Sequence, residues 1–281
     1  TRQACVKTNH NKSIVYGVCS VSLGANSVAS EDVIICPNRL YTNSYSTLKK
    51  VADQVWGTDE ISFIAGGDLS TLKDKMGLAT SEWIVVAFGK GSGKEIQIKT
   101  NITMSMDWVL QRYRKQGSSW TPEDFVGIEV QSIDTTGNYR DNHAAYIEVR
   151  ERSYTPTVIP NSEHGLNWAN VHKRLIPQII RKGNIYRESS RCVGFYFIVP
   201  EIVYQRFEDT LGNLSKETMP DRQHLSVHTY SLGSEGASGT SRDLNLIRTI
   251  HYTLDDVIAA FSNNQSGNAH DELDRALREI L

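Results

Sequence analysis

The feature that most constrains the fold is the nearly continuous apolar run EWIVVAFG at residues 82–89. A strand without polar alternation is typical of a sheet that is covered on both faces. Amphipathic stripes at helical spacing, at residues 46–56 and 167–188, can supply that cover. The sequence therefore predicts an α/β fold, with a central mixed β-sheet flanked by helices.

Strands and helices interleave along the rest of the chain, and turn residues separate them. Further strands are expected at residues 13–22, 32–37, 61–66, 95–99, 104–113, 124–134, 192–200, 225–232 and 244–253. Further helices are expected at residues 69–76, 201–211, 255–261 and 270–281, and SSWTPED at 118–124 is expected to be a turn. The leucine stripe of the last helix predicts core packing, with dimer packing as the alternative.

Charge and hydropathy exclude some classes of protein. The net charge is −2, which argues against a passive, non-specific nucleic-acid binder. Positive charge is local: six lysines and arginines lie between His172 and Arg191, which indicates either a DNA-contacting face or a solvated helix face. No apolar run reaches the length of a membrane span and no signal peptide is recognisable, so we expect no membrane partner and a cytoplasmic location.

Two acidic residues lie in neighbouring strand-like segments, Asp107 in MSMDW and Glu129 in GIEVQ. Carboxylates at the ends of adjacent strands can hold Mg²⁺, the cation that phosphodiester hydrolysis commonly requires. Gln131 shares a face with Glu129 because strand side chains alternate. The alternative is a pair of solvated strand carboxylates, but the apolar neighbours of Glu129 would make an unpartnered charge costly.

Three cysteines, Cys5, Cys19 and Cys36, lie within the first 36 residues, whereas Cys192 opens an apolar strand and is expected to be a buried thiol. Without a secretory context the cluster indicates metal ligation before disulfides, although no CxxC pair is present. We expect residues 1–45 to form a metal-binding element and residues 46–281 to form the main domain. Iron and zinc both suit such a sulfur site, and the sequence does not distinguish them.

Several blocks of the sequence, taken together and in order, resemble those of NotI-like type II restriction endonucleases. The blocks are CVK…GVC…VICPNR, SMDW, GIEVQSIDTTGNY, ANVHKR and RCVGFYFIVP. That family is similar to the PD-(D/E)xK nucleases, with glutamine in place of the motif lysine. The resemblance implies a PD-(D/E)xK core in which Asp107 and Glu129 bind catalytic Mg²⁺ and Gln131 replaces the lysine.

The resemblance also implies further ligands. Glu95 matches an acidic position and would add a ligand for a second Mg²⁺. Cys5, Cys19 and Cys36 match three ligands of a structural four-cysteine iron site, with the fourth expected upstream of Thr1. Since glutamine has no accessible pKa, Gln131 would orient water or donate to a phosphate oxygen and would not act as a base.

DNA contacts follow from the same resemblance and from charge. We expect His172, Lys173 and Arg174 to contact phosphates, and Arg112, Arg114 and Lys115 to reach the backbone or a guanine edge. The expected activity is that of a bacterial restriction-system hydrolase that cuts double-stranded DNA at a GC-rich palindrome, leaving 5′-phosphate and 3′-hydroxyl ends. A palindromic target implies a two-fold homodimer.

Two alternatives remain open. A regulator that is stapled by a cysteine-bound metal would bind a specific sequence without cutting it and would tolerate loss of Glu129. A repair nuclease would cut damaged or branched DNA with no preference for a palindrome. Cleavage mapping separates the three functions.

Overall fold

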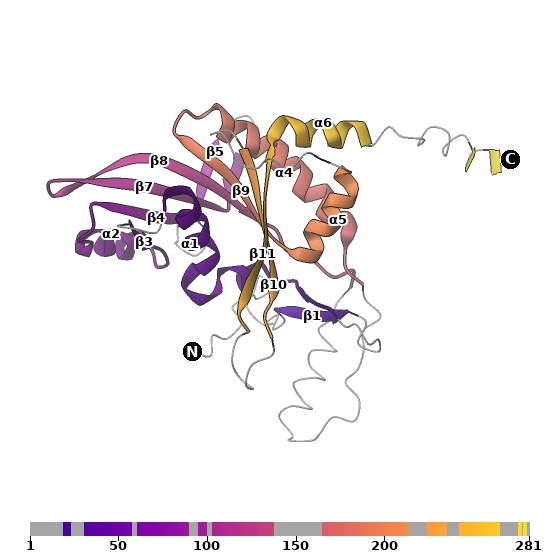
Figure 1. Ribbon diagram of the computed structural model, residues 1–281, viewed down its shortest axis with the longest axis horizontal. Helices are drawn as coiled ribbons and strands as arrows, with labels where there is room; N and C mark the ends of the chain where they lie inside the picture. The colour runs from indigo at the N-terminus through magenta and orange to yellow at the C-terminus, as the bar shows by residue number, and fades with distance from the viewer. Residues whose placement is uncertain are drawn as a thin grey trace, which may run out of the picture.

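The computed structural model describes residues 19–23, 31–57, 61–89, 95–99, 103–137, 165–212, 214, 224–234, 242–264, 275–276 and 278–279. Over these residues the chain is α/β, with a large curled mixed β-sheet flanked by helices (Figure 1). The predicted fold class is confirmed at this level. The finer expectation of a PD-(D/E)xK core stays a prediction.

The main sheet has seven strands in the order β11-β10-β9-β8-β7-β4-β3, so β8 lies at its centre. Their bounds are β3 Ile61–Ile64, β4 Trp83–Gly89, β7 Trp108–Gln116, β8 Ser119–Val130, β9 Cys192–Pro200, β10 His224–Leu232 and β11 Leu244–Thr253. Strand β8 pairs antiparallel with β7 and parallel with β9. Two small antiparallel sheets pair β1 (Ser20–Leu23) with β2 (Glu31–Ile34), and β5 (Ile96–Lys99) with β6 (Thr103–Met106).

Helices cover both faces of the sheet, as the apolar run of β4 requires. The helices are η1 Pro37–Tyr41, α1 Thr42–Trp56, α2 Leu69–Leu78, α4 Trp168–Glu188, α5 Glu201–Leu211 and α6 Leu254–Asn264. Helix α1 packs on one face, in a core with Trp108, Ile128 and Ile198. Helices α4, α5 and α6 pack on the opposite face, where Phe195 and Phe197 of β9 lie.

The expected strand at residues 104–113 is wrong in one respect that bears on the site. The chain bends at Asp107, so that β6 ends at Met106 and β7 begins at Trp108. Asp107 therefore lies at a break between two strands, outside the regular strand pairing of β6 and β7. The periodicity of MSMDWVL does not reveal this bend.

The turn that was expected at residues 118–124 is also wrong, because β8 already begins at Ser119. The chain turns at Gly117, whose φ of 62° favours glycine, and the two-residue loop joins Gln116 to Ser119. Pro122 lies within the strand beside a register shift in the β7–β8 pairing. Such an irregularity accommodates a residue that cannot donate to the ladder.

The described part of residues 1–45 packs into both cores of the main sheet. Val33 and Ile35 belong to the core under α4, whereas Ile34 and Leu40 belong to the core under α1. The hydroxyl of Ser132, just beyond β8, donates to the carbonyl of Ile35 at 3.1 Å. Most of the expected strand at 13–22 and of the expected helix at 270–281 lies outside the described residues.

Candidate active site

Asp107 and Glu129 meet at the end of β8, as their positions in the sequence predict. The main-chain N–H of Asp107 donates to Glu129 Oε1 at 3.3 Å, and the N–H of Val130 donates to Asp107 Oδ2 at 3.0 Å. Each carboxylate is thus held by the main chain next to the other. This reciprocal pairing fixes two acidic groups side by side, which is the arrangement that a cation site requires.

The environment of Glu129 disfavours a free negative charge. Its side chain is 0% exposed, and burial raises its pKa, with the nearby charge of Asp107 adding to the rise. The amine of Lys182 acts in the opposite direction and favours the charged form. Glu129 is therefore a buried acid that needs a cationic partner.

Lys182 supplies that partner in the described structure, although no pattern in the sequence marks it as a site residue. Its Nζ donates to Glu129 Oε2, and its side chain is only 8% exposed. Lys182 lies on α4, which runs antiparallel to β8: Arg174 lies near Asp134 beyond the end of β8, Lys182 lies at Glu129, and Tyr186 lies at Gly127. Helix α4 thus places the amine of Lys182 beside the carboxylate of Glu129, on the face of the sheet that α4 covers.

Tyr186 lies one helical turn beyond Lys182 and packs its ring against β8. Gly127 leaves the room for it, because a Cβ there would lie 2.1 Å from Tyr186 Cζ. Burial raises the pKa of Tyr186 far above its ordinary value, and the charges of Glu129 and Asp107 raise it further. Within the described residues its hydroxyl has no hydrogen-bond partner. Tyr186 therefore forms the apolar wall of the carboxylate site.

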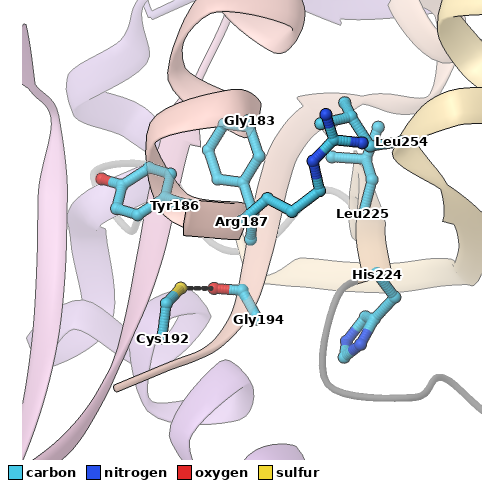
Figure 2. A pocket seen from close by; sticks show the side chains of 9 residues that line it. Gly183, Tyr186, Arg187, Cys192, Gly194, His224, Leu225 and Leu254 are labelled. Atoms are coloured by element: carbon cyan, nitrogen blue, oxygen red, sulfur yellow. Dashed lines mark hydrogen bonds between the residues drawn. The ribbon is translucent and has the colours of Figure 1, made fainter. Parts of the chain in front are cut away.

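A small cavity of about 20 Å³ lies on the other side of this wall, between α4, β9 and β10 (Figure 2). In Figure 2 the Tyr186 hydroxyl points away from the cavity, and Cys192 Sγ donates to the carbonyl of Gly194 at 3.3 Å. Burial raises the pKa of Cys192 to about 11, so it is a protonated, buried thiol, as expected. The cavity has room for about one water molecule and is not a substrate site.

Aromatic side chains pack around Trp108, the residue that follows Asp107. Trp108 is fully buried, and the rings of Tyr41 and Tyr45 meet it edge-on with centroids 5.3 and 5.4 Å away. Burial raises the pKa of Tyr41, and the charge of Asp107 raises it further. Low-dielectric groups therefore surround the residue next to Asp107, and such surroundings strengthen interactions between charges.

Among the described residues, the other two predicted catalytic residues form no hydrogen bond with the pair. Gln131 follows β8, and its side-chain amide donates to the carbonyl of Ser132 at 2.6 Å. Glu95 is exposed and precedes β5; extending the β5–β6 register by one residue places it opposite Asp107. Gln131 and Glu95 therefore flank the site, and their predicted roles stay predictions.

Two of the three predicted cysteine ligands are described, and they are neighbours. The N–H of Cys36 donates to the carbonyl of Cys19 at 3.3 Å, at the end of the β1–β2 pair. Cys36 is buried and Cys19 is exposed. Cys5 lies outside the described residues, so the three-cysteine cluster stays a prediction.

The predicted DNA-contacting residues form two separate groups. Lys173 and Arg174 are exposed near the start of α4, and Arg174 pairs with Asp134 at 3.5 Å; the side chain of His172 lies outside what the structure describes. The second group is on β7 and is engaged with protein groups. Arg112 makes a bidentate pair with Asp124 at 2.7 and 2.9 Å, Arg114 pairs with Glu82 at 3.3 Å, and Lys115 donates to the carbonyl of Ala79 at 3.0 Å.

Distance also separates the two groups. Arg174 is eight residues from Lys182 along α4, or about 12 Å. Arg114 is seven residues from Asp107 along β7, or about 24 Å, and its guanidinium lies over the ring of Trp83. The structure therefore places the α4 group near the carboxylates and the β7 group away from them.

Mg²⁺ commonly takes one or two protein carboxylates and completes its shell with water and phosphate oxygens. Asp107 and Glu129 carry carboxylate oxygens of the kind that such a site uses. Among the residues that the structure describes, no group of three or more His, Cys, Asp or Glu side chains is arranged to hold a metal ion. No helix of the described part of the chain is long and apolar enough to cross a bilayer.

No protein-family model matches this chain, and no curated protein matches it. The resemblance to NotI-like endonucleases therefore stays a prediction that rests on the quoted sequence blocks.

Proposed function

We propose that the protein is a Mg²⁺-dependent endonuclease that cuts double-stranded DNA at a specific palindrome. The observation that carries the proposal is the reciprocal main-chain pairing that holds Asp107 and Glu129 together at the end of β8. A fully buried acid beside a second acid, next to a basic helix, is expected where a phosphate and a cation meet.

The residues would divide the work as follows. Asp107 and Glu129 would hold the cation, which when bound neutralises charge on the phosphate and makes its water a better nucleophile. Lys173 and Arg174 would hold the DNA backbone about two turns of α4 away from the carboxylates. Gln131 would orient water or a phosphate oxygen through its amide, which carries no titratable proton. The products would carry 5′-phosphate and 3′-hydroxyl ends.

Substitutions that keep the hydrogen bonds test the carboxylates most sharply. Asp107→Asn retains an oxygen for the Val130 N–H, and Glu129→Gln retains one for the Asp107 N–H. Purified protein with Mg²⁺ and a long DNA of known sequence should give discrete fragments for the wild type and none for either variant. Asp209→Ala, a change at an acid on α5 that is 71% exposed, is the matched control and should cut like the wild type.

Other outcomes would identify another function. Cutting that survives both substitutions would overturn the proposed site. Specific binding without cutting, unaffected by Glu129→Gln, would indicate a DNA-binding regulator, and cutting confined to branched or damaged DNA would indicate a repair nuclease. Circular dichroism of each variant is the check on folding, since Glu129→Gln leaves Lys182 without its acid.

The proposal includes a two-fold dimer, because a palindrome presents two equivalent half-sites. Light scattering of the purified protein should give twice the 31.5 kDa chain mass. A monomer that remains monomeric on DNA would argue against recognition of a palindrome by paired subunits.

A further inference from the structure

The buried amine beside the carboxylate pair is the least expected feature of the site. We infer that Lys182 is a built-in counter-cation, which occupies the place of a divalent metal on Glu129 and thereby weakens metal binding to the free protein. This inference rests on the proposed function for the identity of the metal. It is tested by metal affinity, without DNA or cleavage.

Contacts of the three groups support this role. Glu129 Oε1 accepts from the main chain of Asp107, so Oε2, which Lys182 holds, is the oxygen that a metal would take. Asp107 Oδ2 accepts from Val130, and among the described residues Asp107 Oδ1 has no hydrogen-bond partner. The amine therefore lies on the atom that a cation bridging the two acids would need.

The count of charges explains how the site can exchange one cation for another. With Glu129 ionised against Lys182, two carboxylates and one ammonium sum to −1, so the site is assembled without metal but is not neutral. Without the ammonium, two neighbouring carboxylates in a buried site would repel each other and attract a divalent cation strongly. Lysine thus keeps the pair in place and competes with the metal for it.

A purely structural role would give a different result. A buried Lys–Glu pair costs much of its Coulomb energy in desolvation, and apolar replacements of both partners are often tolerated. A structural lysine that is removed alone would lower stability and would not improve binding of any ion. A lysine that holds the metal's place would, when removed, weaken the metal-free protein and strengthen metal binding. The two roles therefore differ in the sign of the change in affinity.

The experiment measures Mn²⁺ binding to the full chain without DNA, by the loss of the electron paramagnetic resonance signal of free Mn²⁺. Lys182→Met, which keeps the stem and removes the charge, should bind Mn²⁺ at least about tenfold more tightly than the wild type. Arg181→Met is the matched control, because Arg181 is exposed on the same helix and the same charge is lost. Its affinity should stay within about twofold of the wild type.

Thermal unfolding with and without Mn²⁺ keeps the inference testable if Lys182→Met is unstable. Without Mn²⁺, the variant should unfold at a lower temperature than the wild type. Added Mn²⁺ should raise the unfolding temperature of the variant by more than that of the wild type. An affinity that is unchanged or weaker, or a variant that stays unfolded with Mn²⁺, would overturn the inference. If Lys182→Met binds Mn²⁺ more tightly but the wild type never cuts DNA, this inference stands and the proposed nuclease function fails. If the wild type cuts DNA but the Mn²⁺ affinity of Lys182→Met is unchanged, the nuclease function stands and this inference fails.

Discussion

Gly127 faces the ring of Tyr186 so closely that a methyl group has no room. The ring atoms Cζ, Cε1 and Cε2 would lie 2.1 to 2.4 Å from its Cβ. Both partners are fixed, since β8 is the central strand and Tyr186 is buried on α4. Relief therefore requires α4 to move away from the sheet, together with Lys182 one turn earlier.

We predict that Gly127→Ala lowers the free energy of unfolding by about 1–3 kcal/mol, because overpacking of a fixed core is relieved only by backbone shifts. Urea titrations followed by circular dichroism measure the change. Gly77→Ala is the control, because nothing lies within 4 Å of a Cβ there, and an alanine in α2 should leave stability unchanged or raise it. Equal stability of the wild type and Gly127→Ala would show that α4 is not seated as described.

His228 makes stability depend on pH. It is 1% exposed, and its Nε2 lies 2.7 Å from Gln54 Oε1. Burial lowers its pKa to about 4, with the charges of His251 and Lys50 adding to the effect. An unfolded histidine titrates near 6.5, so the unfolded chain binds the proton first as pH falls.

The contribution of neutral His228 to the free energy of unfolding is therefore fully present above about pH 6.5 and declines as pH falls toward 4. We expect a loss of about 2 kcal/mol at pH 5. His228→Gln keeps an amide donor for Gln54 and removes the titration. Urea midpoints measured at pH 7.5 and pH 5 should differ less in this variant than in the wild type. An identical pH dependence of the two proteins would remove His228 as the cause.

The site residues differ in how far the sequence reveals them. Asp107 and Glu129 could be predicted because each is an acid in an apolar strand segment, where a solvated role is implausible. Lys182 could not, because its partner is 53 residues away and its own helix carries four other lysines and arginines. Only the packing of α4 on β8 separates this lysine from the solvated ones.

Helix α4 links the two parts of the proposed function. It carries the exposed Lys173 and Arg174 near its start and the buried Lys182 near its end. Phosphates that are held by the first turns would therefore lie about two helical turns, or about 12 Å, from the carboxylates. The basic residues of β7 lie toward the end of the strand that is farther from Asp107, and Arg112 is already paired with Asp124.

We predict that Lys173→Ala and Arg174→Ala each weaken DNA binding and reduce the slope of log affinity against log salt by about one unit. Arg114→Ala on β7 should change neither quantity. Fluorescence anisotropy with labelled duplex DNA at several KCl concentrations measures both. A larger effect for Arg114→Ala than for the α4 variants would place the DNA on the other side of the molecule.

Elements were predicted well where the residue pattern is local. The bounds of β9, α5 and β11 agree with the expected ranges 192–200, 201–211 and 244–253. The bend at Asp107 and the strand through Pro122 were missed. Both are decided by pairing with other strands, since the bend allows contact with Glu129 and a register shift admits the proline.

At the scale of the whole molecule, β2 joins the two cores that the sheet separates. Alternate side chains of one short segment enter opposite cores: Val33 and Ile35 the core under α4, and Ile34 the core under α1. Arg39 is buried in the same region and donates to the carbonyl of Arg242. This packing of residues 33–40 in both cores could not be predicted from the sequence, because burial cannot be read from such a short segment.

This arrangement makes the segment necessary for folding. Val33, Ile34, Ile35 and Leu40 are each at most 4% exposed. Burying one such side chain contributes about 1.5–3 kcal/mol, so the four together contribute about 6–12 kcal/mol. Total stabilities of domains are about 5–15 kcal/mol. A chain that begins at residue 46 should therefore lack a cooperative urea transition and should bind the dye ANS.

Point substitutions test the same claim without truncation. Ile34→Ala should lower the free energy of unfolding by about 2–5 kcal/mol, because the side chain is 1% exposed and leaves a cavity. Leu78→Ala removes an equally large side chain that is 82% exposed and should change stability by less than about 0.5 kcal/mol. If the shortened chain unfolded cooperatively and Ile34→Ala matched Leu78→Ala, residues 31–45 would be an appendage, and the sheet would be stable without the segment that joins its two cores.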